Sequence, residues 1–99
     1  MDQVQAAQGF SAMGSEPRLE VLQTLVKAGE TGLLVGEIQN RTGIPASTLA
    51  HHLKFLASAG LVVADKNGRT ITNRANFGHL KELAAYILEE CCADEGRVL

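Results

Sequence analysis

The sequence predicts a mainly α-helical domain of about five helices with a small β-hairpin. Two helical patterns meet at a glycine-containing turn near residue 43, apolar extended residues precede Asn67-Gly68, and a last helical pattern starts at Phe77. This order is typical of a winged helix-turn-helix domain. Because 99 residues with 45% hydrophobic side chains support one core, we expect a single domain over residues 1–94 and a frayed tail over 95–99.

The first two helices are expected over residues 2–13 and from Ser15 to Gly29. The first is weakly amphipathic, and its packing side is expected to carry Val4, Ala7 and Ser11. That side is too thin to hold a helix alone, so it needs a partner surface. Ser15 can cap the second helix, and Pro17 suits its first turn. The apolar residues expected on the inner side of the second helix are Leu19, Leu22, Leu25 and Val26.

Residues 35–59 contain the helix-turn-helix pattern, after a connector over residues 31–34. A brief helix over residues 35–41 is anchored by Ile38, and residues 42–45 form the turn. Ser47 is expected to cap a longer helix that runs to about residue 59, before Gly60. The residues of this longer helix that are expected to face the core are Leu49, Leu53 and Leu56.

A two-stranded wing and a last helix are expected to follow. Residues 61–63 begin an extended segment, Asn67-Gly68 predicts the hairpin turn because both residues tolerate a positive φ, and residues 70–74 return as the second strand. Asn76 can cap a helix over residues 77–92. The apolar residues that share one stripe of that helix are Phe77, Leu80, Ala84, Ile87, Leu88 and Cys91.

The charge distribution along the chain favours a nucleic-acid partner for the middle of the sequence. The net charge is −2, but residues 41–74 hold one acidic side chain, Asp65. The basic residues in the same stretch are Arg41, Lys54, Lys66, Arg69 and Arg74. A binding face responds to the local field rather than to the net charge, so this block is compatible with DNA binding.

The longer helix of the helix-turn-helix pattern is expected to read the major groove of double-stranded DNA. On a helical wheel, Ser47, His51 and Lys54 lie opposite the leucines, Thr48 lies at the edge, and His52 lies nearer the core. Lys66 and Arg69 flank the hairpin tip, where they can reach phosphates or a minor groove. The residues expected to contact DNA are Ser47, Thr48, His51, His52, Lys54, Lys66 and Arg69.

Three segments resemble the ArsR/SmtB family of metal- and metalloid-responsive repressors. The sequence SEPRLEVL at residues 15–22 is similar to the second-helix signature of that family, and LAHHLKFLASAGLV at residues 49–62 is similar to its recognition helix and the entry to its wing. Gly68-Arg69 matches the wing tip. The resemblance implies a homodimer joined through its first and last helices, which represses a palindromic operator until an inducer releases it.

Cys91 and Cys92 are the candidate inducer site. The pair resembles the vicinal cysteines that end the last helix in an arsenical-responsive branch of the family, and soft thiolates suit trivalent arsenic. Inorganic arsenite prefers three sulfurs, and residues 93–99 contain no cysteine. Three possibilities stay open: arsenite with an oxygen ligand, a cysteine borrowed across the dimer, or methylarsenite, whose methyl group occupies one valence. No resident cofactor is expected.

Other inducer sites and chemistries fit the residues present less well. The family's third-helix arsenic site needs Cys-x-Cys, where this chain has residues 34–36, Leu-Val-Gly. A zinc site would have to combine His79 with nearby glutamates at poor spacing. The cysteine pair could instead be oxidised or persulfidated, or Cys91 could simply pack as a small hydrophobe while Cys92 is an incidental surface thiol. Nearby acidic residues and the negative helix end oppose thiolate formation.

The sequence also favours some classes of protein over others. It has no glycine-rich phosphate loop, no plausible nucleophile and base pair, and no Cys-x-x-Cys, so we do not expect an enzyme. A winged helix used for protein interaction is the alternative, which the basic block disfavours. No apolar run is long enough to span a bilayer and no signal peptide is evident, so we expect a cytoplasmic protein with no membrane partner.

Overall fold

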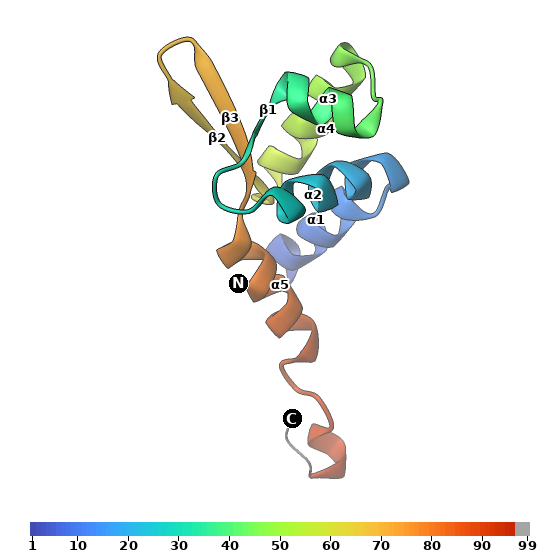
Figure 1. Ribbon diagram of the computed structural model, residues 1–99. Helices are drawn as coiled ribbons and strands as arrows, with labels where there is room; N and C mark the ends of the chain where they lie inside the picture. Colours follow the sequence, from blue (N-terminus) through green and yellow to red (C-terminus); the bar gives the residue numbers. More distant parts are fainter. Residues whose placement is uncertain (97–99) are drawn as a thin grey trace.

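The computed structural model describes residues 1–96 and has the winged helix-turn-helix architecture (Figure 1). Its elements in chain order are α1 (Gln3–Met13), α2 (Glu16–Ala28), β1 (Leu33–Leu34), α3 (Val35–Thr42), α4 (Ala46–Ser58), β2 (Val62–Asn67), β3 (Thr70–Ala75), α5 (Phe77–Leu88) and a 3-10 turn, η1 (Ala93–Glu95). The first four helices form the body, the hairpin projects from one side, and α5 leads away to the C-terminal end. The five helices and the wing confirm the expected fold class.

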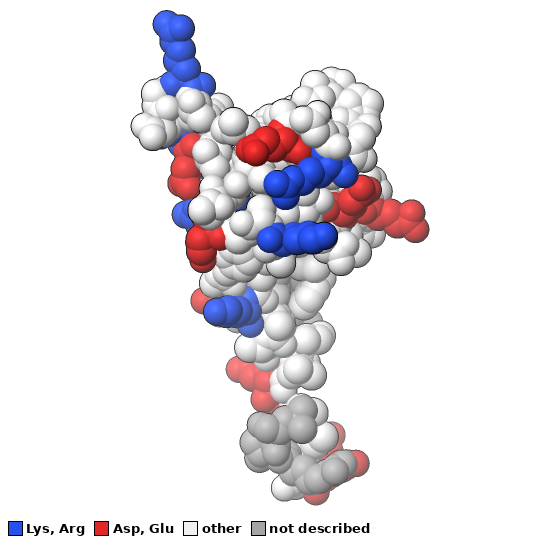
Figure 2. Space-filling model, viewed as in Figure 1, with Lys and Arg blue, Asp and Glu red and all other residues white. Residues whose placement is uncertain are grey.

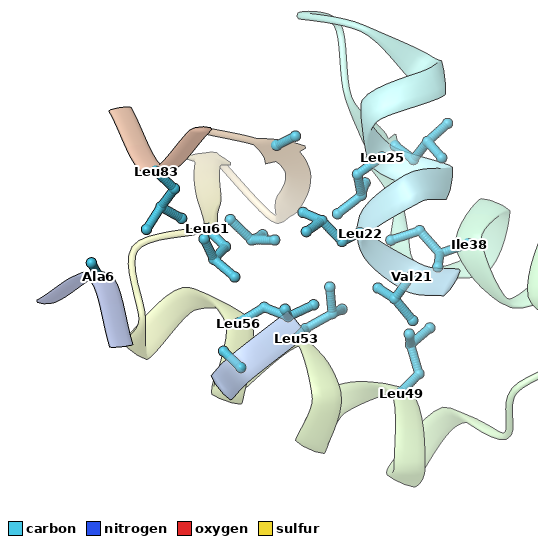
Figure 3. Close-up of a cluster of buried hydrophobic side chains, with 14 residues drawn as sticks. Ala6, Val21, Leu22, Leu25, Ile38, Leu49, Leu53, Leu56, Leu61 and Leu83 are labelled. Carbon is cyan, nitrogen blue, oxygen red and sulfur yellow. The ribbon is translucent and has the colours of Figure 1, made fainter. Parts of the chain in front are cut away.

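The core is formed mainly by α2 and α4, with contributions from α1, α3, the sheet and Leu83 of α5. Leu49 and Leu56 of α4 are fully buried and Leu53 nearly so, which confirms the inward leucine pattern. Figure 3 shows them facing Val21 and Leu22 of α2. Burying such a side chain contributes about 1.5–3 kcal/mol. This packing fixes which side of α4 is left for solvent.

Helix α2 turns a different side to the core than the sequence predicts. Val21, Leu22 and Leu25 are buried, whereas Leu19 and Val26 are about 40% exposed. The expectation that Leu19 and Val26 lie on the inner side of this helix is therefore wrong. The buried arc is centred on the Val21 side because α3, α4 and β3 all cover that side of α2.

Helix α1 packs through small residues rather than through the side predicted from its apolar pattern. Ala6, Gly9 and Ala12 are buried, whereas Val4 and Ser11 are exposed. A Cβ atom at Gly9 would lie 2.8 Å from Leu83 Cδ1 of α5, so a larger residue here would have to displace the end of the Leu83 side chain. Small residues score weakly in any hydrophobic pattern, which is why the sequence indicated the wrong side.

Substituting Gly9 tests this contact between α1 and α5. Gly9→Leu is expected to destabilise the protein by about 1–3 kcal/mol, because the new side chain overpacks against Leu83. Gly36→Ala is the matched control: Gly36 is helical with open space around it, so the alanine should stabilise by roughly 0.5–1 kcal/mol. Urea denaturation measures both. A Gly9→Leu protein as stable as the native one would contradict the packing.

The wing is part of a three-stranded antiparallel sheet in the order β1-β3-β2. Leu33 pairs with Asn73 and Leu34 with Thr72, so the stretch expected as a plain connector contains a strand. The hairpin turn also differs by one residue. Asn67 pairs with Thr70, so Gly68 and Arg69 form the loop, with φ +66° at Gly68 and no positive φ at Asn67. Glycine at the first loop position suits a type II′ turn.

Helix α5 ends at Leu88, four residues before the expected end. Glu89 and Glu90 place negative charge at the negative end of the helix dipole, and Ile87 and Leu88 are exposed, so little packing extends the helix. Cys91 is therefore not on the α5 stripe, and that expectation was wrong. The sequence predicts a frayed tail over residues 95–99. Glu95 is the last residue of η1, and residues 97–99 lie outside the described part.

Candidate nucleic-acid interface

Helix α4 starts two residues earlier than expected. Its N-cap is Pro45, whose side chain accepts no capping hydrogen bond, and Ser47 lies within the first turn. Ser47 is therefore not the cap, and its exposed hydroxyl stays available for an outside partner. The uncapped amide groups of the first turn and the positive end of the helix dipole favour an anion such as a phosphate near this end.

The polar residues predicted for DNA contact lie together on the solvent side of α4. Ser47, Thr48, His51 and Lys54 are exposed, and His52 is half-buried, in the order that the helical wheel indicates. Lys54 has no ion-pair partner within residues 1–96. We call Ser47, His51 and Lys54 the α4 ridge. The structure thus leaves a polar, cationic surface opposite the buried leucines.

The wing presents two further basic residues. Lys66 pairs with Ile71 near the end of the hairpin, and Arg69 lies in the turn itself; both are exposed. A blue basic side chain extends from the hairpin tip in Figure 2. The hairpin and α4 lie at the same end of the molecule in Figure 1. One duplex could therefore meet both elements.

Arg74 does not belong to the free basic surface, although the sequence placed it in the basic block. Its Nε atom donates a hydrogen bond of 2.7 Å to Asp65 Oδ2, and its Nη1 atom lies 3.9 Å from Glu30 Oε2. The hydrogen bond to Asp65 and the charge of that carboxylate raise the pKa of Arg74. Asp65 in β2 neutralises the charge of Arg74 in β3. Arg74 therefore stabilises the hairpin rather than extending a cationic surface.

Arg18 has a positioning role that the sequence did not indicate. From α2 its Nε atom donates to the carbonyl oxygen of Ala12 at 2.5 Å, which satisfies one of the open carbonyls at the end of α1. Its guanidinium also lies 4.3 Å from the ring centroid of Phe55 in α4. One side chain therefore joins α1, α2 and α4. Helix α2 also carries Glu16, Glu20 and Lys27, so nothing in the sequence distinguishes Arg18 from a solvated charge.

Asn76 joins the end of α4 to the start of α5. Its Oδ1 atom accepts from the His79 amide at 3.2 Å, which confirms the predicted cap, and its Nδ2 atom donates to the Gly60 carbonyl at 3.0 Å. The Asn76 amide also donates to the Leu61 carbonyl. These bonds tie the start of α5 to the residues that follow α4.

The two cysteines lie beyond α5, far along the chain from the α4 ridge (Figure 1). Both are half-buried thiols with Sγ atoms 3.2 Å apart, and Cys92 has a left-handed φ of 62°. The hydrogen bond with Cys92, and then burial, raise the pKa of Cys91. No cluster of three or more His, Cys, Asp or Glu residues suited to a metal occurs within residues 1–96, so the pair has no third ligand from that part of its own chain.

Comparisons with known proteins match the part of the chain that holds the helix-turn-helix. A family model described as a helix-turn-helix domain matches residues 13–63. The chain is 38% identical over 69 residues to YceK, an uncharacterised HTH-type transcriptional regulator of Bacillus subtilis, covering 70% of this chain and 67% of YceK. Both the family model and YceK are described by the helix-turn-helix rather than by an enzyme activity, as the sequence predicts.

Two solved structures extend the likeness to nearly the whole chain. An ArsR-like transcriptional regulator from Rhodococcus sp. RHA1 is 31% identical, with a TM-score of 0.78, over 95% of this chain and 85% of the other. The homodimeric winged helix-turn-helix domain of Mb0332 from Mycobacterium bovis, described as a possible ArsR-family regulator, is 27% identical, with a TM-score of 0.66, over 88% of this chain and 81% of the other.

No helix within residues 1–96 is both long and apolar enough to cross a membrane.

Proposed function

Because the chain belongs to the ArsR family of winged helix-turn-helix transcriptional regulators, we propose that it is a cytoplasmic homodimeric repressor that trivalent arsenicals release from its operator. The α4 ridge and the wing tip contact DNA, and Cys91 and Cys92 bind the inducer. The observation that carries the DNA-binding part is the exposed polar and cationic side of α4 opposite three buried leucines. A gel shift with DNA from upstream of the chain's own coding sequence tests it; no retardation at low salt would refute it.

Two helices support the homodimer. Ile87 and Leu88 of α5 are 67% and 57% exposed, and Phe10 of α1 is also partly exposed. These apolar side chains lie on the elements through which the resemblance places the dimer contact, and a second copy would cover them. The homodimeric Mycobacterium bovis neighbour supports the same assembly. Sedimentation equilibrium should give a dimer, and Ile87→Glu should shift the protein towards monomer.

The spacing of the two thiols supports capture of a single soft atom. At a sulfur–metal distance of about 2.3 Å, sulfurs 3.2 Å apart subtend an angle of roughly 90° at the bound atom. That angle suits a pyramidal trivalent arsenic. Each thiol forms one As–S bond and its proton leaves with an arsenic hydroxyl as water, so methylarsenite reacts with two thiols and releases two waters. Since only two sulfurs are near, we favour methylarsenite over arsenite.

A redox-responsive repressor is the second candidate function. The 3.2 Å contact between the Sγ atoms would also let an oxidant such as a peroxide join them, with loss of two protons and two electrons to the oxidant. Loss of DNA binding with peroxide but not with methylarsenite would favour this candidate. Loss with methylarsenite under reducing conditions would favour the arsenical.

Removing the wing-tip charge is expected to weaken DNA binding for all sequences alike. Arg69→Ala should reduce the slope of log affinity against log salt by about 0.9, because one phosphate contact is lost. Fluorescence anisotropy at several salt concentrations measures the slope. Lys81→Ala, an exposed charge on α5, is the matched control and should leave the slope unchanged. Equal slopes for both variants would show that Arg69 at the wing tip does not contact DNA.

The thiol pair makes a prediction about pH. Because its hydrogen bond with Cys92 raises the pKa of Cys91, Cys92→Ala should lower that pKa and increase the thiolate fraction of Cys91 at any pH below it. Alkylation of Cys91 by iodoacetamide at pH 8, followed by tandem mass spectrometry, should therefore become faster. In the native protein, arsenical capture should accelerate as pH rises from 7 to 9. Slower alkylation of Cys91 in the variant would contradict the hydrogen bond.

A further inference from the structure

A groove of about 750 Å³ runs between α1 and the outer side of α4. Its apolar lining includes Val4 and Ala7 from α1, Phe55 from α4, and Ala59 directly after α4. Small-molecule sites in proteins commonly have volumes of roughly 300–1,000 Å³ and apolar walls with a few polar groups. The size and lining of this groove are within that range.

The polar side chains that line the groove include one lysine and no carboxylate. Lys54 and His51 line it and no acidic residue does, and Lys54 makes no ion pair in the described part of the chain. Phe55 is 51% exposed, an unusual state for a large aromatic side chain, and Arg18 lies against its ring at 4.3 Å. The same Arg18 is hydrogen-bonded to the end of α1. An apolar floor that is held in place and bordered by a free ammonium group is complementary to an amphipathic anion.

We propose that this groove binds a small organic anion with an apolar body of one or two aromatic rings, and that it is a second ligand site separate from the cysteine pair. The carboxylate or sulfonate group contacts the Lys54 ammonium, and the apolar body lies on Phe55 and Val4. Phe10, which we assign to the dimer surface, lies about 120° around α1 from Val4 and about 60° from Ala7. The groove therefore opens beside the proposed dimer surface, and the oligomeric state of the groove variant is part of the test.

Occupation of this groove has a consequence for DNA binding. His51 and Lys54 line the groove and also belong to the α4 ridge, so a bound anion covers side chains that DNA needs. The anion and DNA should therefore exclude one another. This exclusion depends on the proposed function, whereas binding of the anion does not, so the two are measured separately.

The test uses two fluorescent probes of similar shape and different charge. 8-Anilinonaphthalene-1-sulfonate is an anion, and N-phenyl-1-naphthylamine is neutral. Lys54→Met should weaken binding of the sulfonate about tenfold and leave the neutral probe unchanged, because one charge-assisted contact is lost. Lys27→Met, an exposed charge at the end of α2, is the matched control and should change neither. Ala7→Trp, which fills the groove from an exposed position, should abolish binding of both probes.

Two results would overturn the groove as a ligand site. Sulfonate binding that survives Ala7→Trp places the probe elsewhere on the protein. Conversion of the Ala7→Trp protein from dimer to monomer by sedimentation would make the groove a subunit interface. Sulfonate binding with the expected variant pattern, in a protein that does not bind DNA, would support the groove and refute the repressor function.

Discussion

Replacing His51 and Lys54 together with alanine is expected to lower the affinity for operator DNA about a hundredfold, because two side chains of the α4 ridge then make no contact in the major groove. Each base or phosphate contact of this kind contributes roughly 1–3 kcal/mol. Both side chains are exposed, so the stability of the fold should change little. Fluorescence anisotropy with upstream DNA measures the affinity, and urea denaturation measures the stability.

Two control variants make this result specific to the α4 ridge. Gln23→Ala and Lys27→Ala are exposed changes on α2, remote from the ridge in sequence and on another element, and should leave the affinity unchanged. The single variants should differ in kind. Lys54→Ala should weaken binding to all sequences, whereas His51→Ala should also reduce the preference for operator over random DNA. A double variant that binds as tightly as the native protein would show that α4 does not carry recognition.

Replacing either cysteine with serine is expected to abolish release by methylarsenite while leaving DNA affinity intact. In the native protein, coupling between inducer and DNA sites is typically worth about 1–3 kcal/mol, so methylarsenite should lower the DNA affinity by roughly 5- to 150-fold. With one cysteine left, arsenic can form one As–S bond instead of two. Methylarsenite should then leave the DNA affinity almost unchanged, a factor of about one. The cysteines lie beyond α5, away from the α4 ridge, so serine at either site should not affect DNA binding directly.

The double variant and a competing thiol complete this experiment. Cys91→Ser with Cys92→Ser should behave like the single variants, because the two sulfurs act as one site. An excess of a small dithiol should restore DNA binding of the native protein by removing the arsenic. Release of the double variant by methylarsenite would place the inducer site elsewhere in the molecule.

Much of the recognition unit could be predicted from sequence because its signals are local and strong. Leu49, Leu53 and Leu56 recur at helical spacing, and all three are buried. Once that side of the helix packs inward, His51 and Lys54 must face solvent. The Asn67-Gly68 pair indicated the hairpin correctly, but only the strand register shows that Gly68 and Arg69 form its loop. Register depends on pairing between strands, which a single segment does not contain.

The features that the sequence predicted wrongly depend on tertiary contacts. The close approach of α1 to α5 rests on Gly9, a residue with no side chain for a hydrophobic pattern to count. The two-residue strand β1 exists because β3 pairs with it, and Leu33-Leu34 alone is too short to predict it. Helix α5 stops after Ile87 and Leu88, which are exposed, so Cys91 and Cys92 lie beyond the helix rather than on it.

The contributions of Arg18 and Asn76 show a similar limit. The cap at Asn76 was predictable from its position before Phe77, whereas its bond to Gly60 crosses 16 residues. The contact of Arg18 with Phe55 joins two helices that are separated by a strand and a third helix. Such long-range polar contacts leave no periodic trace in one sequence. They become visible only when the elements are placed in space.

The most direct test of DNA binding by this side of the molecule is a map of the contacting surface by nuclear magnetic resonance. Isotope-labelled protein is titrated with upstream DNA, and backbone amide shifts are followed residue by residue. We predict that the largest changes occur in α4 and at residues 66–69, with His51, Lys54 and Arg69 prominent, while the start of α2 changes little. Changes concentrated on α5, with the α4 ridge and the wing tip unmoved, would contradict the central claim that the ridge and the wing bind the duplex.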